Sequence, residues 1–85
     1  MPLSVTEIKV GVNFYLTGQL NVASDGSKGR GKSFSNYKVH IVRILDKDVP
    51  YPILLGDNYS DQLGWVSAAE LRGEVTVGIT NVTIA

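Results

Sequence analysis

The stretch from Tyr51 to Gly73 constrains the fold of this chain more than any other part of it. It begins with an apolar run in which Pro52 favours extended backbone for the residue before it. A polar segment rich in turn-forming residues follows, and extended structure resumes at Gly64. Ser67 then caps a run, residues 68–71, that is too short for more than one 3₁₀-like turn. The stretch therefore predicts a short β-hairpin closed by a tight corner.

Residues 8–16 show the cleanest alternation in the sequence, because every second side chain is apolar. A period of two predicts a half-buried strand rather than a helix. Thr17 and Gly18 should end this strand, and a shorter extended piece should resume after them. The apolar positions of the alternating segment are Ile8, Val10, Val12, Phe14 and Leu16.

Residues 37–45 predict a second long strand, since they are β-branched and apolar. The apolar side chains change face between Ile41 and Val42. This change predicts either a bulge at that point or a strand covered on both faces.

Residues 74–84 predict a final extended segment. Val75, Val77 and Ile79 are in phase with one another, whereas Val82 and Ile84 are out of phase with them. A bulge or turn near residues 80–81 would return both to the core. An apolar terminal strand is either a plain closing strand or an edge open to another chain, and the sequence leaves both open.

Residues 25–35 combine glycine, serine and basic side chains, which predicts a surface loop. Residues 26–33 match the phosphate-binding pattern GxxxxGK[ST]. The context excludes a nucleotide-hydrolysing loop, because an apparent strand follows where a helix is required. Lys28, Arg30 and Lys32 are instead candidates for contact with an anion, such as a teichoic acid, or with an acidic partner surface.

With 85 residues, the chain is expected to form a single domain spanning residues 1–85. The absence of cysteine excludes disulfides. The net charge is zero, with +4 on residues 1–45 and −4 on residues 46–85, so no nucleic-acid partner is expected. Neither a signal peptide nor a membrane span is expected. The chain is therefore expected to be soluble, without an export leader of its own.

The inventory of catalytic groups is small. His40 is the single histidine, and no nucleophile and base pair can be nominated from spacing. The sequence therefore predicts a protein that is not an enzyme and that uses no metal or cofactor.

Recognition groups are more abundant, because the chain has four tyrosines, two phenylalanines and one tryptophan. A tyrosine on a partly exposed surface combines apolar area with a hydroxyl that can form hydrogen bonds. Either these tyrosines line a groove or they only cover the surface of the fold. The groove candidates are Tyr15, Tyr37, Tyr51 and Tyr59, with Trp65 as a core residue or a groove wall.

The stretch from Tyr51 to Gly73 resembles the C-terminal half of bacterial SH3-like domains, which are the wall-binding modules of phage endolysins and autolysins. The likeness covers roughly residues 8–73 and leaves residues 74–85 as an additional strand. It implies a small barrel with a groove, between the first long loop and the sheet, for a peptidoglycan cross-bridge or stem peptide. The residues that carry it are Tyr51, Pro52, Leu54, Gly56, Gly64, Trp65, Val66, Ala69, Glu70 and Leu71, with Val10, Gly11, Phe14, Gly18, Ser24, Val39 and Ile41 upstream.

The sequence therefore predicts an all-β, SH3-like barrel of five or six strands with one 3₁₀ turn. The first function hypothesis is a module that binds bacterial cell-wall peptide or polymer and acts at the wall. The alternative is a small structural protein of a phage particle, a capsid decoration or tail component, that binds other virion subunits. In either case the C-terminal strand could join copies of the chain, and neither a nucleic acid nor a membrane is an expected partner.

Overall fold

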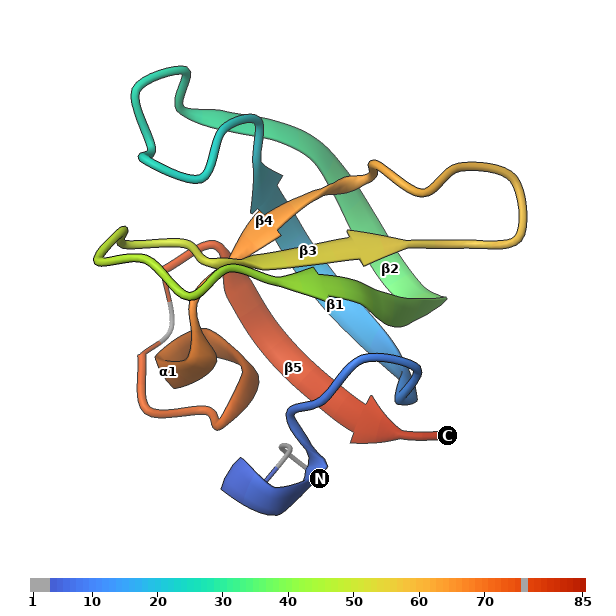
Figure 1. Cartoon of the computed structure of the whole chain (residues 1–85). Helices are drawn as coiled ribbons and strands as arrows, with labels where there is room; N and C mark the ends of the chain where they lie inside the picture. Colours follow the sequence, from blue (N-terminus) through green and yellow to red (C-terminus); the bar gives the residue numbers. More distant parts are fainter. Residues whose placement is uncertain (1–3, 76) are drawn as a thin grey trace.

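The computed structural model describes residues 4–75 and 77–85, which form five strands, one short α-helix and one 3₁₀ turn (Figure 1). The predicted all-β fold is confirmed. Neither helical segment in these ranges is long and apolar enough to cross a membrane. The elements are η1 (Val5–Glu7), β1 (Asn13–Asn21), β2 (Arg30–Ile44), β3 (Ile53–Gly56), β4 (Gly64–Val66), α1 (Ala68–Leu71) and β5 (Ile79–Ile84).

All five strands belong to one antiparallel sheet in the order β2-β3-β4-β1-β5. β2 also pairs with β1, so the pairings among the first four strands form a circuit. The pairing between β1 and β4 is the shortest in the circuit, because it consists of the single register pair Asn21 and Trp65. β5 lies outside the circuit and pairs with β1, alongside which it runs in Figure 1.

β2 is 15 residues long because it serves two neighbours. Its first part pairs with β1, for example Val39 with Phe14, and its last part pairs with β3, for example Ile41 with Leu55. The register shifts between Ile41 and Arg43, which leaves Val42 as the extra residue. The bulge predicted at this point is confirmed, and it explains why the apolar side chains change face there.

The core is built mainly from alternating strand positions of the circuit, with further residues from α1 and β5. Phe14 and Leu16 are buried, whereas Asn13 before them and Tyr15 between them are not. Full burial of a large aliphatic or aromatic side chain contributes about 1.5–3 kcal/mol. The main cluster consists of Phe14, Leu16, Leu20, Val39, Ile41, Ile53, Leu55, Val66, Leu71, Ile79 and Val82.

The predicted strand at residues 8–16 is wrong in its first half, since β1 begins at Asn13. Gly11 has a φ of +94°, and the Val12 amide donates to the Lys9 carbonyl, so the chain turns here. Val10 consequently points into solvent. Two bonds, Gly11 N–H to the Ile41 carbonyl and Ile41 N–H to the Val12 carbonyl, still attach this turn to β2.

The break predicted at Gly18 is also wrong, because β1 continues through it. Gly18 has a φ of +144° and lies against Gly78, whose carbonyl oxygen would be 2.1 Å from a Cβ atom at position 18. The missing side chain therefore allows two segments to touch without ending the strand.

The final strand begins later than the alternation predicts. Val75 and Val77 are exposed outside β5, and Thr76 lies outside the described residues. Gly78, with a φ of +86°, turns the chain into β5. The predicted bulge is confirmed, since Thr80 has no register partner between Ile79 and Asn81.

That bulge returns Val82 to the core, as predicted. It does not bury Ile84, which stays exposed near the end of the chain.

Two shorter predictions also need correction. The loop predicted at residues 25–35 spans residues 22–29, because β2 already begins at Arg30. The phosphate-loop pattern thus leads into a strand and not a helix, in agreement with its exclusion.

The 3₁₀-like turn predicted after Ser67 is instead one turn of α-helix, stabilised by a capping box. The 3₁₀ turn of this structure is η1.

Candidate functional site

The aromatic groove candidates do not gather in one place. Tyr37 and Tyr59 line one hollow, Tyr51 lines a second and Trp65 lines a third. Tyr15 lies half-buried on β1, in register with Lys38 and Thr83, and lines none of these three. The single groove implied by the tyrosines is therefore replaced by separate surfaces with different chemistry.

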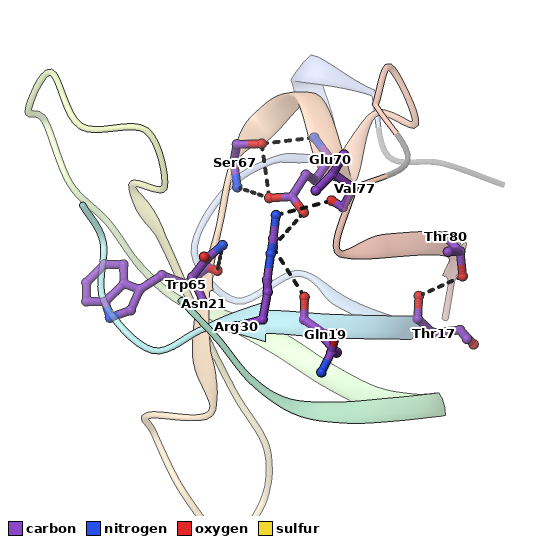
Figure 2. Close-up of polar contacts among 9 residues, drawn as sticks. All are labelled: Thr17, Gln19, Asn21, Arg30, Trp65, Ser67, Glu70, Val77 and Thr80. Atoms are coloured by element: carbon purple, nitrogen blue, oxygen red, sulfur yellow. Dashed lines mark hydrogen bonds and ion pairs between the residues drawn. The ribbon is translucent and has the colours of Figure 1, made fainter. Parts of the chain in front are cut away.

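The Arg30 side chain, one of the three candidates for contact with an anion or an acidic partner, is engaged inside the molecule. Its Nη1 atom lies 3.1 Å from Glu70 Oε2, and the side chains of Arg30 and Glu70 are only 20% and 2% exposed. The guanidinium also donates to the carbonyls of Gln19 and Val77, both at 3.4 Å. Figure 2 shows the arginine reaching from β2 toward α1 and the segment before β5.

The two carboxylate oxygens of Glu70 bond to two different parts of the chain, the N-terminal end of α1 and the start of β2. Oε1 accepts from the Ser67 backbone N–H at 3.2 Å, and Ser67 Oγ in turn accepts from the Glu70 N–H at 3.1 Å. Oε2 faces Arg30 (Figure 2). Because the ion pair joins β2 to α1, it connects the basic half of the sequence to the acidic half. Breaking a buried pair of this kind costs about 3–5 kcal/mol.

Tyr51 is held by Arg30 and by two residues of the first loop. The Arg30 guanidinium carbon lies 5.2 Å from the centre of its ring, within the range of a cation–π interaction. Its backbone N–H donates to the Ser24 carbonyl at 2.9 Å. Gly26 lies against the ring, since a Cβ atom there would be 2.9 Å from Tyr51 Cε2. Gly78 lies against the guanidinium, since a Cβ atom there would be 2.1 Å from Arg30 Nη1, and we call Arg30, Tyr51, Glu70 and Gly78 the arginine clamp.

A mostly apolar hollow of about 350 Å³ lies over the clamp. Val75 and Val77 border it, and Val77 is 69% exposed. Arg30 and Glu70, which border this hollow, are paired with each other, so neither presents an unpaired charge to a ligand.

The Trp65 hollow lies between the base of the first loop and the β3–β4 hairpin, and has a volume of about 280 Å³. Glycine shapes it on two sides. A Cβ atom at Gly31 would be 2.9 Å from Val22 Cγ2, and one at Gly64 would be 2.4 Å from Leu20 Cβ. Val22 therefore lies over β2 and remains 51% exposed.

The Trp65 indole is half-buried and, in Figure 2, projects away from the clamp. Its backbone carbonyl accepts a long bond, 3.5 Å, from the Asn21 side chain. Lys32 is exposed and lines the same hollow, together with Gln62. Lys28 is exposed on the first loop and is not among the residues that line the hollow. Of the three predicted cations, Lys32 alone shares a hollow with Trp65.

The hollow lined by Tyr37 and Tyr59, of about 200 Å³, lies between β2 and the loop after β3. Asp57 organises it, because the Tyr37 hydroxyl donates to Oδ2 and the backbone N–H groups of Tyr59 and Ser60 donate to Oδ1 at 2.8 and 2.7 Å. The Tyr37 hydrogen bond, followed by the Tyr59 amide, lowers the pKa of Asp57. The same bond raises the pKa of Tyr37, since it holds the phenolic proton.

Tyr59 itself is 92% exposed at the border of this hollow. Tyr37 is half-buried, and its ring stacks on Phe34 with centroids 5.2 Å apart. The structure thus brings two predicted tyrosines together, one packed and one free.

Sequence reasoning missed the roles of two residues that organise these surfaces, Glu70 and Asp57. Ser67 and Glu70 match the S-x-x-E capping-box pattern, which could have assigned Glu70 to α1 but not to Arg30. Asp57 precedes Asn58 in a turn, and aspartate commonly accepts from backbone N–H groups two or three residues further on. Its bond to Tyr37 has no local signal, because it joins positions 20 residues apart.

Comparison of the chain with protein-family models, with curated proteins and with solved structures gives no match.

Proposed function

We propose that this chain is a non-enzymatic recognition domain of SH3-like type that binds a short peptide of the bacterial cell wall in the Trp65 hollow. The observation that carries the proposal is the position of this hollow, between the first loop and the β3–β4 hairpin. The resemblance to wall-binding domains implies a groove between the first long loop and the sheet, and Trp65 and Gly64 are among the residues that carry the resemblance.

The chemistry of the hollow suits a small polar peptide. The indole of Trp65 and the exposed part of Val22 offer apolar area to methylene groups or a glycine backbone. The Lys32 ammonium can pair with a carboxylate, and the Gln62 amide can donate to or accept from a peptide unit. The volume is just below the usual range for ligand pockets, about 300–1,000 Å³, so only a few residues of a peptide would fit.

Trp65 is the single tryptophan, so its fluorescence reports on this hollow alone. The test titrates the chain with a synthetic wall stem pentapeptide and with pentaglycine, and measures co-sedimentation with purified Gram-positive walls. We expect a saturable fluorescence change with one of the peptides and sedimentation with the walls.

Lys32→Ala and Lys28→Ala form a matched pair, since each removes one exposed lysine. Loss of a charge-assisted bond of about 1.5–3 kcal/mol should weaken binding about tenfold or more for Lys32→Ala. Lys28→Ala should change it less than about twofold, because Lys28 lies outside the hollow. The proposal fails if walls and peptides leave the protein unaffected, or if the two variants behave alike.

A second candidate function is a subunit of a phage particle, and the edge formed by β5 favours it. Within the described residues β5 pairs with β1 alone, so its other side is open to a strand from a neighbour. Residues 79–84 contain no charged side chain and no proline, which are the usual devices that block such pairing. Ile84 is exposed at this strand as well.

This second candidate predicts association that grows with protein concentration in sedimentation velocity. Thr83→Lys places a charge at an exposed position of β5 and should abolish the association. Thr6→Lys places the same charge at an exposed position of η1 and should leave the association unchanged. A chain that stays monomeric at all concentrations, and that binds no other virion subunit, would exclude this candidate.

A further inference from the structure

The hollow beside Tyr59 has polar groups of both kinds fixed around an exposed aromatic face. It is lined by donors and acceptors from β2, from the start of β1 and from the loop after β3. The bonds of Asp57 to Tyr59 N–H and Ser60 N–H, together with the Asp57 N–H to Ser60 carbonyl bond of 2.8 Å, hold the loop in one turn. The backbone that carries the Tyr59 ring is therefore held in place although the ring is not packed.

Packing does not explain Tyr59. A side chain that is 92% exposed contributes almost no buried area to the fold. Its hydroxyl forms none of the hydrogen bonds found in the described part of the chain, whereas that of neighbouring Tyr37 donates to Asp57. The free ring face is thus the most exposed apolar surface at this hollow, whose other aromatic ring, that of Tyr37, is half-buried.

Asp57 keeps part of its hydrogen-bonding capacity. A carboxylate has about four lone-pair sites, of which Tyr37, Tyr59 and Ser60 occupy three. The remaining capacity lies on Oδ2, which accepts from Tyr37 alone. The side chains of Asn13, Lys38 and Asn58, which also line the hollow, supply further donors and two amide acceptors.

We propose that this hollow binds one pyranose ring of a neutral saccharide, with the ring stacked on Tyr59 and its hydroxyls bonded to Asp57, Lys38 and the two asparagine amides. A sugar presents hydroxyls that both donate and accept, and a face of C–H groups that suits the electron-rich face of an aromatic ring. A charged ligand of either sign would meet a like charge, because both the Asp57 carboxylate and the Lys38 ammonium line the hollow, and an apolar ligand would leave the polar lining unsatisfied. The volume of about 200 Å³ limits the site to a single ring.

This inference goes beyond the proposed peptide site and is independent of it, because the two hollows share no lining residue. The test records ¹⁵N–¹H spectra of the full chain during titration with chitotriose, and in parallel with maltotriose, each up to about 50 mM, which detects a Kd of about 10 mM or tighter. We expect saturable shifts of the amides of Asn58, Tyr59 and Ser60 with at least one saccharide.

Variants separate stacking from other contributions. Tyr59→Ala should weaken saccharide binding about tenfold or more, while Tyr59→Phe should stay within about threefold of the original chain, because it keeps the ring face. Lys32→Ala, in the other hollow, should leave saccharide binding unchanged. The proposal is overturned if neither sugar shifts these amides, if Tyr59→Ala binds as well as the original chain, or if the stem peptide shifts these amides instead.

Discussion

Tyr51 and Tyr59 are the same residue type in two very different surroundings. Tyr51 lies between Arg30 and Gly26, beside the ion pair of Arg30 with Glu70. Tyr59 stands on a turn held by Asp57, with its ring in solvent. The difference teaches that neighbouring groups decide whether an aromatic side chain is structural or free to bind, and glycines at 26 and 78 allow the first case.

The largest effect is expected for Glu70→Ala in the clamp. It removes the partner of an arginine side chain that is only 20% exposed, and also the Glu70 half of the capping box at the start of α1. We expect a loss of about 3–5 kcal/mol in the free energy of unfolding, measured with urea. Glu74→Ala is the matched control, because its ion pair with Arg72 is exposed, and it should leave the midpoint nearly unchanged. Equal losses in the two variants would show that the clamp is no more important than a surface pair.

Gly78→Ala should have the next largest effect. The new Cβ atom would lie 2.1 Å from Arg30 Nη1, and the residue has a φ of +86°. Backbone strain and displacement of the arginine together should cost about 2–4 kcal/mol.

Gly29→Ala sharpens this result, since Gly29 also has a positive φ, +71°, but has nothing within 4 Å of the Cβ position. It should cost only the backbone strain, about 1–2 kcal/mol. If both variants lose the same amount, the contact with Arg30 contributes nothing.

Tyr37→Phe should have a smaller effect that depends on pH. The lowered pKa of Asp57 means that its hydrogen bond stabilises the fold above the ordinary titration range of aspartate and is lost as the pH falls through the folded pKa. The raised pKa of Tyr37 means that the contribution is lost again as the pH rises through the folded pKa of the phenol. The stability difference between the original chain and Tyr37→Phe should therefore be largest near neutral pH and shrink in acid. A difference that stays constant across the acid range would contradict the assignment.

Tyr59→Ala should have the smallest effect on folding, with no measurable change in the urea midpoint. The bonds that hold its turn come from its backbone N–H and from that of Ser60, and both remain in the variant. A clear loss of stability would mean that the ring packs on the protein in solution, and would remove the contrast with Tyr51.

Local patterns predicted much of the fold. The alternation at Phe14 and Leu16, the bulge at Val42 and the cap at Ser67 each depend on residues close in sequence. The errors at Gly11 and Gly18 came from glycine conformations that tertiary contacts determine, because either residue can turn the chain or continue a strand.

The candidate sites were harder to predict, since they depend on contacts between distant positions. The sequence named Arg30 as a cation, but its pairing with Glu70, 40 residues away, has no local signal. The hydrogen bond between Tyr37 and Asp57, which are 20 residues apart, likewise has no local signal. Lys32 and Trp65 were both named, but only the pairing of the strands places them at one hollow.

The most direct test of the central claim, that the clamp is structural while the Trp65 hollow binds, is a ¹⁵N–¹H titration of the full chain with soluble Gram-positive cell-wall fragments. We predict saturable shifts of the Trp65 indole N–H and of the amides of Val22, Lys32 and Gln62, with the amides of Tyr51 and Glu70 unmoved. Shifts centred on Tyr51, Ala69 and Glu70, with the indole unmoved, would contradict the account.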